Sequence, residues 1–223
     1  MGWWRSLFPL PTHGTDVERR LRGVHATPMV ESVVGGVVTI GGRVDPLEAL
    51  AIAPLTGRRC VYWTLTISEI MQSLMSVELA NLEGGASFLV VDAAGRARVI
   101  PERARISAPA ETRLRAVRHV NVTGVWGPFA SEPPLLSPDE SKITAPLRLS
   151  IARTSRLRLT EYVIEPDATV LVRALAELEP DPQGGEVGYR ESPTRLVLSS
   201  SKRRPLLIRA TPGRSSVQAS PGI

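Results

Sequence analysis

Short runs of β-branched and aromatic residues recur along most of the chain, and each is typical of a β-strand. The strongest is CVYWTLTI, which begins at Cys60. Two of the runs are separated only by Ala93-Ala94-Gly95, which predicts a hairpin with a short glycine-containing loop. The runs cover residues 37–44, 60–67, 87–92, 96–100, 147–151, 156–164, 168–175, 195–199 and 205–209. About nine short strands with few helices predict a mainly β fold, a barrel or a sandwich.

One short N-terminal helix is predicted before the strands. Residues 16–26 are weakly amphipathic, with Asp16 as the expected N-cap. Thr27-Pro28 is the expected stop, because a residue that precedes proline avoids the α region.

The chain divides into three expected parts. Residues 1–15 form an aromatic N-terminal segment, residues 16–210 a β-rich domain, and residues 211–223 a disordered basic tail. A proline-rich run at 127–142 is a candidate linker between two halves of the domain. Its acidic pair, Asp139-Glu140, is expected to lie in a solvated loop.

The composition of the chain excludes several classes of protein. The chain has 223 residues, 43% of them hydrophobic, which is enough for a globular core and excludes wholesale disorder. No run approaches the roughly 18 apolar residues of a membrane-spanning helix. The single cysteine, Cys60, excludes an internal disulfide and a cysteine-rich zinc site.

The positive charge is concentrated at the C-terminal end. The sequence pI is about 10.1, yet six of the 27 basic residues follow Glu191, the last acidic one. The rest of the chain is therefore close to neutral. Aromatic residues make up only 4% and are not interleaved with basic ones, which argues against a groove for single-stranded nucleic acid.

No catalytic, cofactor-binding or metal-binding residues are expected. His13, His25 and His119 are far apart in the sequence, and phosphate-loop, dinucleotide and Gly-x-Ser-x-Gly motifs are absent from it. Cys60 lies in the most apolar predicted strand, where a buried thiol is more typical than a nucleophile.

The N-terminal segment carries Trp3, Trp4 and Phe8. Pro9 and Pro11 interrupt its apolar run, so it lacks the core of a secretory signal. Two interpretations stay open: the aromatic side chains fold back as an apolar lid or meet a protein partner, or they contact a membrane. In the second case they would act together with the basic residues Lys202, Arg203 and Arg204.

Several blocks of the sequence resemble the GIDE-type domain, also called the beside-a-membrane domain. The most specific block is PLTGRRCVY, which begins at Pro54; the others are Thr39–Val44, the stretch from Phe88 to Pro101, and Glu161–Leu175. The resemblance covers about residues 27–210. It implies a β-rich recognition or scaffold module, with Arg58 and Arg59 as candidate recognition residues. The blocks also suit a tight turn at Pro54–Gly57 and an Asx-type role for Asp92.

The family includes mitochondrial RING-type E3 ubiquitin ligases and bacterial proteins without an assigned activity. This chain has only four Cys and His residues, too few for a RING. We therefore expect a non-catalytic interaction module, bacterial, and either cytoplasmic or peripheral to a membrane, with an unidentified protein partner. The alternatives are an OB-like nucleic-acid-binding protein and a ligase homologue that has lost its RING.

Overall fold

The computed structural model describes residues 13–32, 34–70, 76–117, 137–144, 155–182, 193–201 and 204–211. Within these ranges the chain is mainly β, as predicted, with thirteen strands where about nine were expected. The elements are α1 (His13–Leu21), η2 (Met29–Glu31), β1 (Val37–Pro46), β2 (Ala51–Ile52), β3 (Arg59–Cys60), β4 (Tyr62–Ile70), β5 (Ser76–Gly85), β6 (Phe88–Val91), β7 (Arg96–Val99), β8 (Arg105–Ser107), β9 (Ala110–Val117), α2 (Pro138–Thr144), β10 (Ser155–Ile164), β11 (Thr169–Pro180), β12 (Thr194–Ser199) and β13 (Leu207–Thr211).

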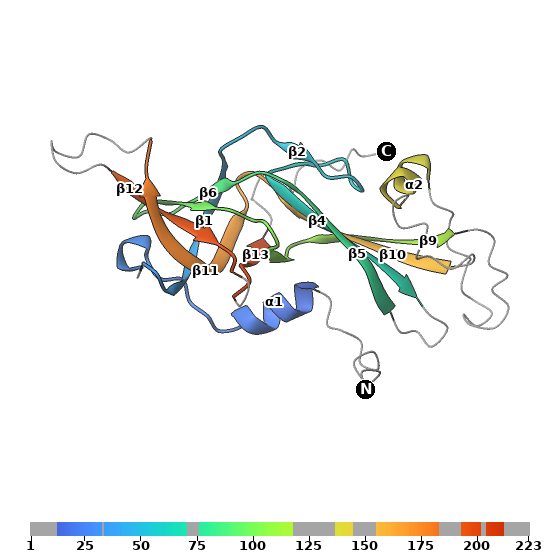
Figure 1. Cartoon of the computed structure of the whole chain (residues 1–223), viewed down its shortest axis with the longest axis horizontal. Helices are drawn as coiled ribbons and strands as arrows, with labels where there is room; N and C mark the ends of the chain where they lie inside the picture. Colours follow the sequence, from blue (N-terminus) through green and yellow to red (C-terminus); the bar gives the residue numbers. More distant parts are fainter. Residues whose placement is uncertain are drawn as a thin grey trace, which may run out of the picture.

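Five strands close into a barrel at one end of the molecule (Figure 1). Their order is β1-β6-β7-β12-β11, and β11 pairs again with β1. The β7–β12 pair is parallel, whereas the other four pairs of the barrel are antiparallel. β13 pairs with the same edge of β11 as β12 does, and β8 continues the sheet beyond β13.

Alternate residues of the barrel strands fill its interior. Phe88 is fully buried and belongs to a core made mostly of small and β-branched side chains. Members of this core on the barrel strands include Ile40, Val44, Val90, Ala97, Val99, Val170, Val172, Ala174, Ala176 and Leu198.

Gly42 lies where β1 changes partner from β11 to β6. Arg43, the next residue, is in register with both Thr169 and Val91. A Cβ atom on Gly42 would lie 2.5 Å from the backbone oxygen of Val91, closer than real Cβ atoms come to backbone. The close approach of the two strands therefore requires glycine at this position.

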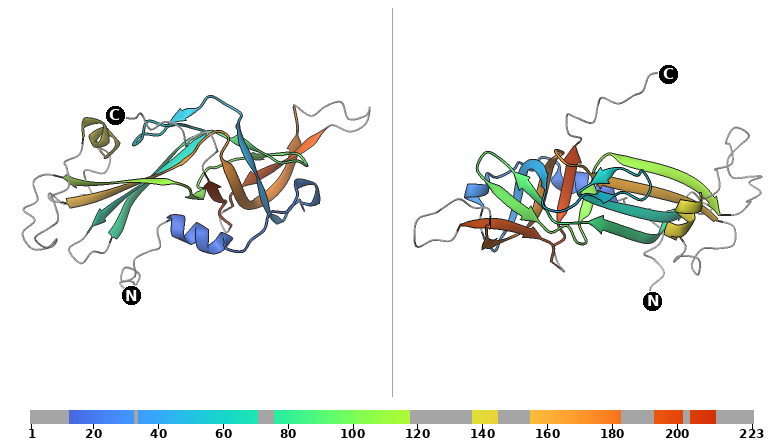
Figure 2. Two further views of the ribbon diagram at one scale, coloured as in Figure 1. Left: turned by 180° about the vertical axis from the view of Figure 1, so that it is seen from behind. Right: turned by 90° about the horizontal axis from the view of Figure 1, so that it is seen from above.

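A second antiparallel sheet, in the order β5-β4-β10-β9, extends away from the barrel (Figures 1 and 2). At the barrel end, Tyr62, Tyr162 and Ile164 of this sheet belong to the barrel core. Further out, one face of the sheet packs under the β2–β3 hairpin and α2, around a separate core. That core contains Leu55, Leu65, Ile67, Leu157 and Leu159, with Ile143 against it.

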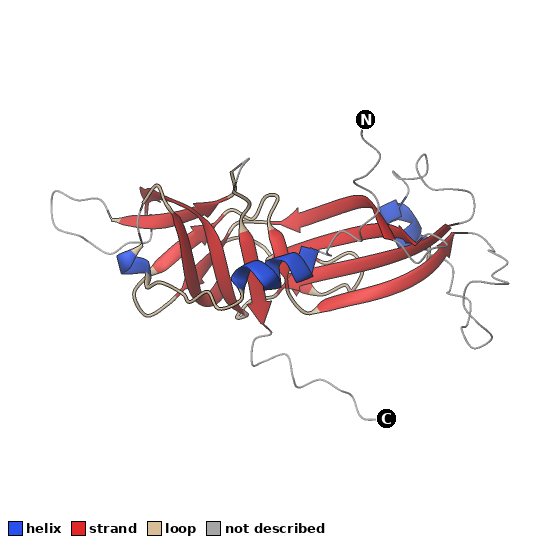
Figure 3. Cartoon of the chain, turned by 90° about the horizontal axis from the view of Figure 1, so that it is seen from below, coloured by secondary structure: helices blue, strands red, loops and turns tan. Residues whose placement is uncertain are grey.

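The helix α1 lies across β8 and β13, beside the barrel (Figure 3). Its apolar residues Val17 and Leu21 pack on Leu207 of β13. It begins at His13 and ends at Leu21, so the predicted boundaries, residues 16 and 26, were wrong at both ends. Gly23 ends the helix early, because its φ of 70° turns the chain as a C-terminal glycine does.

The candidate linker at 127–142 is helical over its described part, which is contrary to expectation. Ser137 precedes α2, and its Oγ accepts the N–H of Glu140 at 3.2 Å. The carboxylate of Glu140 accepts the N–H of Ser137 at 2.9 Å in return. This is a capping box, and Pro138 at the first helical position supports it. Residues 127–136 lie outside the described ranges.

Two of the additional strands, β5 and β9, were missed because they form the edges of the second sheet. Their sequences, SVELANLEGG and AETRLRAV, mix charged and apolar residues, as an edge with one open face permits. The strand expected at 147–151, most of the N-terminal segment and the tail beyond Thr211 lie outside the described residues.

Candidate functional site

The two arginines singled out by the family resemblance face different surroundings. Arg58 is half-buried, and its Nη1 lies 3.3 Å from Oε1 of Glu165. It lines a small cavity of about 150 Å³ together with Pro109 and Val163. Arg59 follows on β3 and is exposed. The pair therefore does not form one cationic site, and Arg58 is held by a carboxylate of its own chain.

The turn Pro54–Gly57 is tied to β10 by a buried carboxylate. Glu161 is completely buried, and its oxygens accept the N–H of Leu55 at 2.7 Å and of Thr56 at 3.1 Å. The Thr56 hydroxyl donates a third bond at 2.6 Å. Gly57 closes the turn with a φ of 71°. The turn is present as predicted, and its connection to Glu161 is architectural.

Cys60 is buried, in agreement with its predicted structural role. Its thiol is fully inaccessible and lies 3.7 Å from the carbonyl oxygen of Ala51. Burial, with a further contribution from the Glu161 carboxylate, raises the pKa of the thiol to about 11. A thiol with so high a pKa is a poor nucleophile near neutral pH.

Asp92 has the predicted Asx role. Its Oδ1 accepts the N–H of Ala94 at 2.7 Å and that of Gly95 at 2.8 Å, which stabilises the β6–β7 turn.

Glu140 is not solvated, contrary to its expected place in a loop. Its side chain is 4% exposed and accepts two hydrogen bonds from Arg115, from Nε at 2.7 Å and from Nη2 at 2.8 Å. Burial alone would raise its pKa, but the bonds from Arg115, Ser137 and Arg113 outweigh burial and lower the pKa to about 2. The ion pair joins α2 to β9.

Tyr62 of β4 and Glu83 of β5 form a further pair, within the second sheet. The hydroxyl of Tyr62 donates to Oε2 of Glu83 at 2.6 Å, and the backbone N–H of Arg103 donates to the same carboxylate. Burial and the neighbouring carboxylate raise the pKa of the tyrosine well above its usual value. The phenol is thus a hydrogen-bond donor here.

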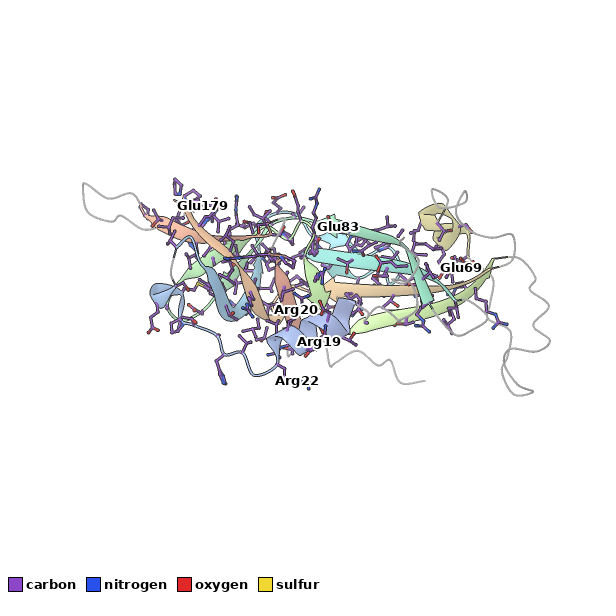
Figure 4. All side chains as sticks on the ribbon, turned by 60° about the horizontal axis from the view of Figure 1, so that its bottom comes forward. Arg19, Arg20, Arg22, Glu69, Glu83 and Glu179 are labelled. Atoms are coloured by element: carbon purple, nitrogen blue, oxygen red, sulfur yellow. The ribbon has the colours of Figure 1, made fainter. Side chains whose placement is uncertain are left out.

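An ion-pair array covers the outer face of β7, β11 and β12. Arg96 lies 2.8 Å from Asp181, and Arg195 lies 2.6 Å from Glu179, which also meets Arg98 at 3.2 Å. These arginines of the barrel surface therefore already face carboxylates; Figure 4 labels Glu179 in this region.

A hollow of about 540 Å³ lies where α1, β11 and the start of β13 meet. Three arginines line it: Arg20 from α1, Arg173 from β11 and Arg204 from the turn before β13. We call it the arginine hollow; its other lining residues are Val37, Ala174, Pro205 and Leu207. Arg19, Arg20 and Arg22 gather around the C-terminal part of α1 (Figure 4).

The charges of the arginine hollow are largely without local partners. Within the described ranges, the structure records neither a hydrogen bond nor an ion pair for the side chains of Arg173 and Arg204. Arg20 contacts Asp16 through Nε at 2.9 Å. That carboxylate also meets Arg19 at 2.7 Å and Arg105 at 2.8 Å. Burial would raise the pKa of Asp16, but the three arginines lower it below its ordinary value.

Of the candidate membrane-contact residues, Arg204 is the one that the structure describes. It is exposed at the arginine hollow. Trp3, Trp4, Phe8, Lys202 and Arg203 lie outside the described ranges. Sequence reasoning missed Arg20 and Arg173, because nothing in the sequence signals that Arg20 of α1 and Arg173 of β11 line the same hollow.

The described residues contain no cluster of three or more His, Cys, Asp or Glu that could hold a metal ion. His25 is exposed, and His119 falls outside those residues. Neither helix in the described part of the chain has the length and apolar character needed to cross a membrane. Comparison with models of protein families, with curated proteins and with solved structures gives no match for this chain.

Proposed function

We propose that this chain is a non-catalytic, GIDE-like interaction module that associates with an anionic membrane surface from the cytoplasmic side. One observation carries the proposal: Arg20 of α1 and Arg204 of the basic segment line the same hollow. α1 directly follows the aromatic N-terminal segment in the chain. Arg204 of the basic segment therefore shares the hollow with the helix that follows the aromatic segment in the chain.

Reversible membrane binding generally needs two weak signals, such as an apolar insertion and a basic patch. Trp3 and Trp4 precede His13, the first residue of α1, by about ten residues, and an extended chain covers up to about 3.3–3.6 Å per residue. The linking chain is therefore long enough for the aromatic residues to contact the same membrane surface as the arginines of the hollow. The basic residues would contribute about 1 kcal/mol each near anionic lipid.

The use of the buried reactive groups supports a non-catalytic role. The Glu161 carboxylate accepts backbone hydrogen bonds, and the Glu140 carboxylate accepts hydrogen bonds from arginine. The Cys60 thiol is buried and has a raised pKa. Groups used in this way stabilise a scaffold. A protein partner remains part of the proposal, and a reproducible partner in a pulldown from the native cells would support it.

Flotation with vesicles tests the membrane association. We expect the full chain to float with vesicles containing anionic lipid and not with neutral ones. The variant Trp3→Ala/Trp4→Ala should lose most of this binding, and Lys202→Ala/Arg203→Ala should weaken it. The basic residues are substituted and not removed by truncating the chain before residue 205, because Leu206 and Ile208 belong to the barrel core. Equal behaviour of all variants on both vesicle types contradicts the proposal.

The strand order of the barrel favours one alternative, an OB-like nucleic-acid binder. A five-stranded Greek-key barrel of this order has its usual ligand face on the second and third strands, here β6 and β7. On β7, however, Arg96 and Arg98 already pair with carboxylates. The outward side chains of these strands also lack the aromatic rings on which bases stack.

Titration with single-stranded DNA and RNA at two salt concentrations separates the two functions. Binding to phosphates weakens steeply as salt rises, because bound counterions are released. Tight, salt-dependent binding that is unaffected by Trp3→Ala/Trp4→Ala would favour the nucleic-acid binder over the membrane module.

A further inference from the structure

We infer that the arginine hollow is a binding site for the phosphate group of an anionic organic ligand. This inference deepens the proposed function, since a membrane lipid is one source of such a phosphate; a soluble organic phosphate is the other. The argument rests on the charge, the rigidity and the shape of the hollow.

The hollow combines three positive charges, and no acidic side chain is among its lining residues within the described chain. The outer face of β7 and β12 shows the contrast, because Arg96 and Arg195 there lie within 2.8 Å of carboxylates. Two of the three guanidinium groups, those of Arg173 and Arg204, have no recorded carboxylate partner in the described chain, so the arginines around the hollow repel each other and raise the local potential. Both effects favour the entry of an anion.

Asp16 does not cancel this charge. It is shared among Arg19, Arg20 and Arg105, so the group of four carries a net charge of +2. Its contact with Arg20 uses Nε, and the structure records no other partner for that guanidinium within the described residues. The two Nη groups of Arg20 thus remain as donors for a ligand.

The three arginines extend from well-fixed backbone. Arg173 lies within β11, in register with Thr39 of β1 on one side and Leu207 of β13 on the other. The N–H of Arg204 donates to the carbonyl of Ser201 at 3.2 Å, and the N–H of Ser201 donates to the carbonyl of Arg204 at 2.9 Å. A ligand therefore meets positions that are already ordered, which lowers the entropic cost of binding.

Arg20 is fixed through the packing of α1. Val17 and Leu21, on the same helix, are fully buried against the barrel beside Leu207. Arg20 therefore extends from a helix whose position is fixed, and it lines the hollow together with Arg173.

Size and chemistry select the ligand class. The volume of about 540 Å³ lies within the usual range for small-molecule sites, roughly 300–1,000 Å³, and exceeds what a bare phosphate fills. The planar guanidinium matches phosphate oxygens in a two-pronged geometry. Val37, Pro205 and Leu207 add an apolar part to the lining, suited to the organic portion of the ligand.

The test compares Arg173→Gln/Arg204→Gln with Arg43→Gln/Arg103→Gln. The control pair removes the same charge from exposed positions outside the hollow. Soluble probes are pyrophosphate and inositol trisphosphate, measured by calorimetry. There are two vesicle probes of equal surface charge. One contains phosphatidic acid, which is a phosphate monoester, and the other contains phosphatidylserine. A single-stranded oligonucleotide is the fifth probe. Arg20 stays unchanged, because its ion pair with Asp16 supports α1.

We expect the hollow variant to bind a phosphate probe at least tenfold more weakly than the native chain, with the control pair within about twofold of native. Binding to inositol trisphosphate without a preference for phosphatidic acid vesicles identifies a soluble ligand. A preference for phosphatidic acid over phosphatidylserine identifies a lipid. Either result supports the inference.

Three results overturn it: native-like binding of the phosphate probes by the hollow variant, equal losses in the hollow and control variants, or hollow-dependent binding of the oligonucleotide alone. The proposed function fails separately. If vesicle flotation depends on Trp3 and Trp4 but not on Arg173 and Arg204, the membrane module stands without a lipid in the hollow, and the soluble phosphate probes alone decide the inference. If soluble phosphates bind but vesicles do not, the phosphate site stands and the membrane module does not.

Discussion

Glu161, in the middle of β10, accepts a hydrogen bond from the backbone N–H of Leu55 across 106 residues of sequence. With Thr56 donating two more bonds, one carboxylate holds the turn that precedes β3. Two blocks of the GIDE resemblance, PLTGRRCVY and Glu161–Leu175, are thus in direct contact.

Glu161→Gln should lower the free energy of unfolding by about 1–3 kcal/mol, because an amide cannot accept all three bonds and leaves a buried donor unpaired. Urea denaturation measures the change. The matched control is Glu177→Gln, at an exposed position of β11, which should change stability by less than about 0.5 kcal/mol. Equal effects of the two substitutions would show that the buried contact contributes nothing.

Glu140 should make stability sensitive to acid. Its pKa is lowered in the folded chain to about 2 from an ordinary 4.5, so its contribution is fully present above about pH 4.5 and is lost as the pH falls towards 2. The contribution is on the order of 3 kcal/mol.

Chemical denaturation between pH 2 and pH 7 tests this, with Glu140→Gln expected to flatten the acid-dependent part of the curve. Asp139→Asn, one residue away and exposed, is the control and should leave that dependence nearly intact. A Glu140→Gln curve parallel to that of the native chain would contradict the prediction.

Cys60 should resist alkylation in the folded chain. The thiol is fully buried, and its pKa is raised to about 11, so the reactive thiolate is scarce and shielded at pH 8. Mass spectrometry after treatment with iodoacetamide should show almost no label under native conditions and complete labelling in denaturant. Rapid labelling of the native chain would mean that the β2–β3 hairpin opens readily.

Gly42→Ala should destabilise the barrel by about 1–3 kcal/mol, because the new methyl group meets the backbone of Val91, which cannot move aside. Gly95→Ala is the matched control, since a Cβ atom there has no neighbour within 4 Å. Thermal unfolding should separate the two variants by several degrees. A native-like melting temperature for Gly42→Ala would refute the close approach of β1 and β6.

The sequence predicted strands where one face is buried by β-branched residues, as in β4, β10 and β11. It missed β5 and β9, whose open faces leave a mixed pattern without clear alternation. It also missed α2, although Ser137, Pro138 and Glu140 form a capping signal that outweighs the surrounding prolines.

The arginine hollow could not be predicted from the sequence, for a physical reason. Arg20, Arg173 and Arg204 come from three distant segments, and only the packing of α1 against β11 and β13 brings them together. Arg58 and Arg59 show the converse. They are adjacent in the sequence, yet one is held by Glu165 and the other faces solvent.

The closure of the barrel by β1 and β11 has a consequence for biosynthesis. Val37 pairs with Leu175, so β1 leaves the ribosome long before its partner exists. At about 5–20 residues per second, the unpaired edge stays open for on the order of ten seconds. Contacts this distant in sequence also slow the folding step itself. During that interval the nascent chain exposes a template for wrong pairing, and we expect its yield in cells to depend on chaperones more than its final stability would suggest.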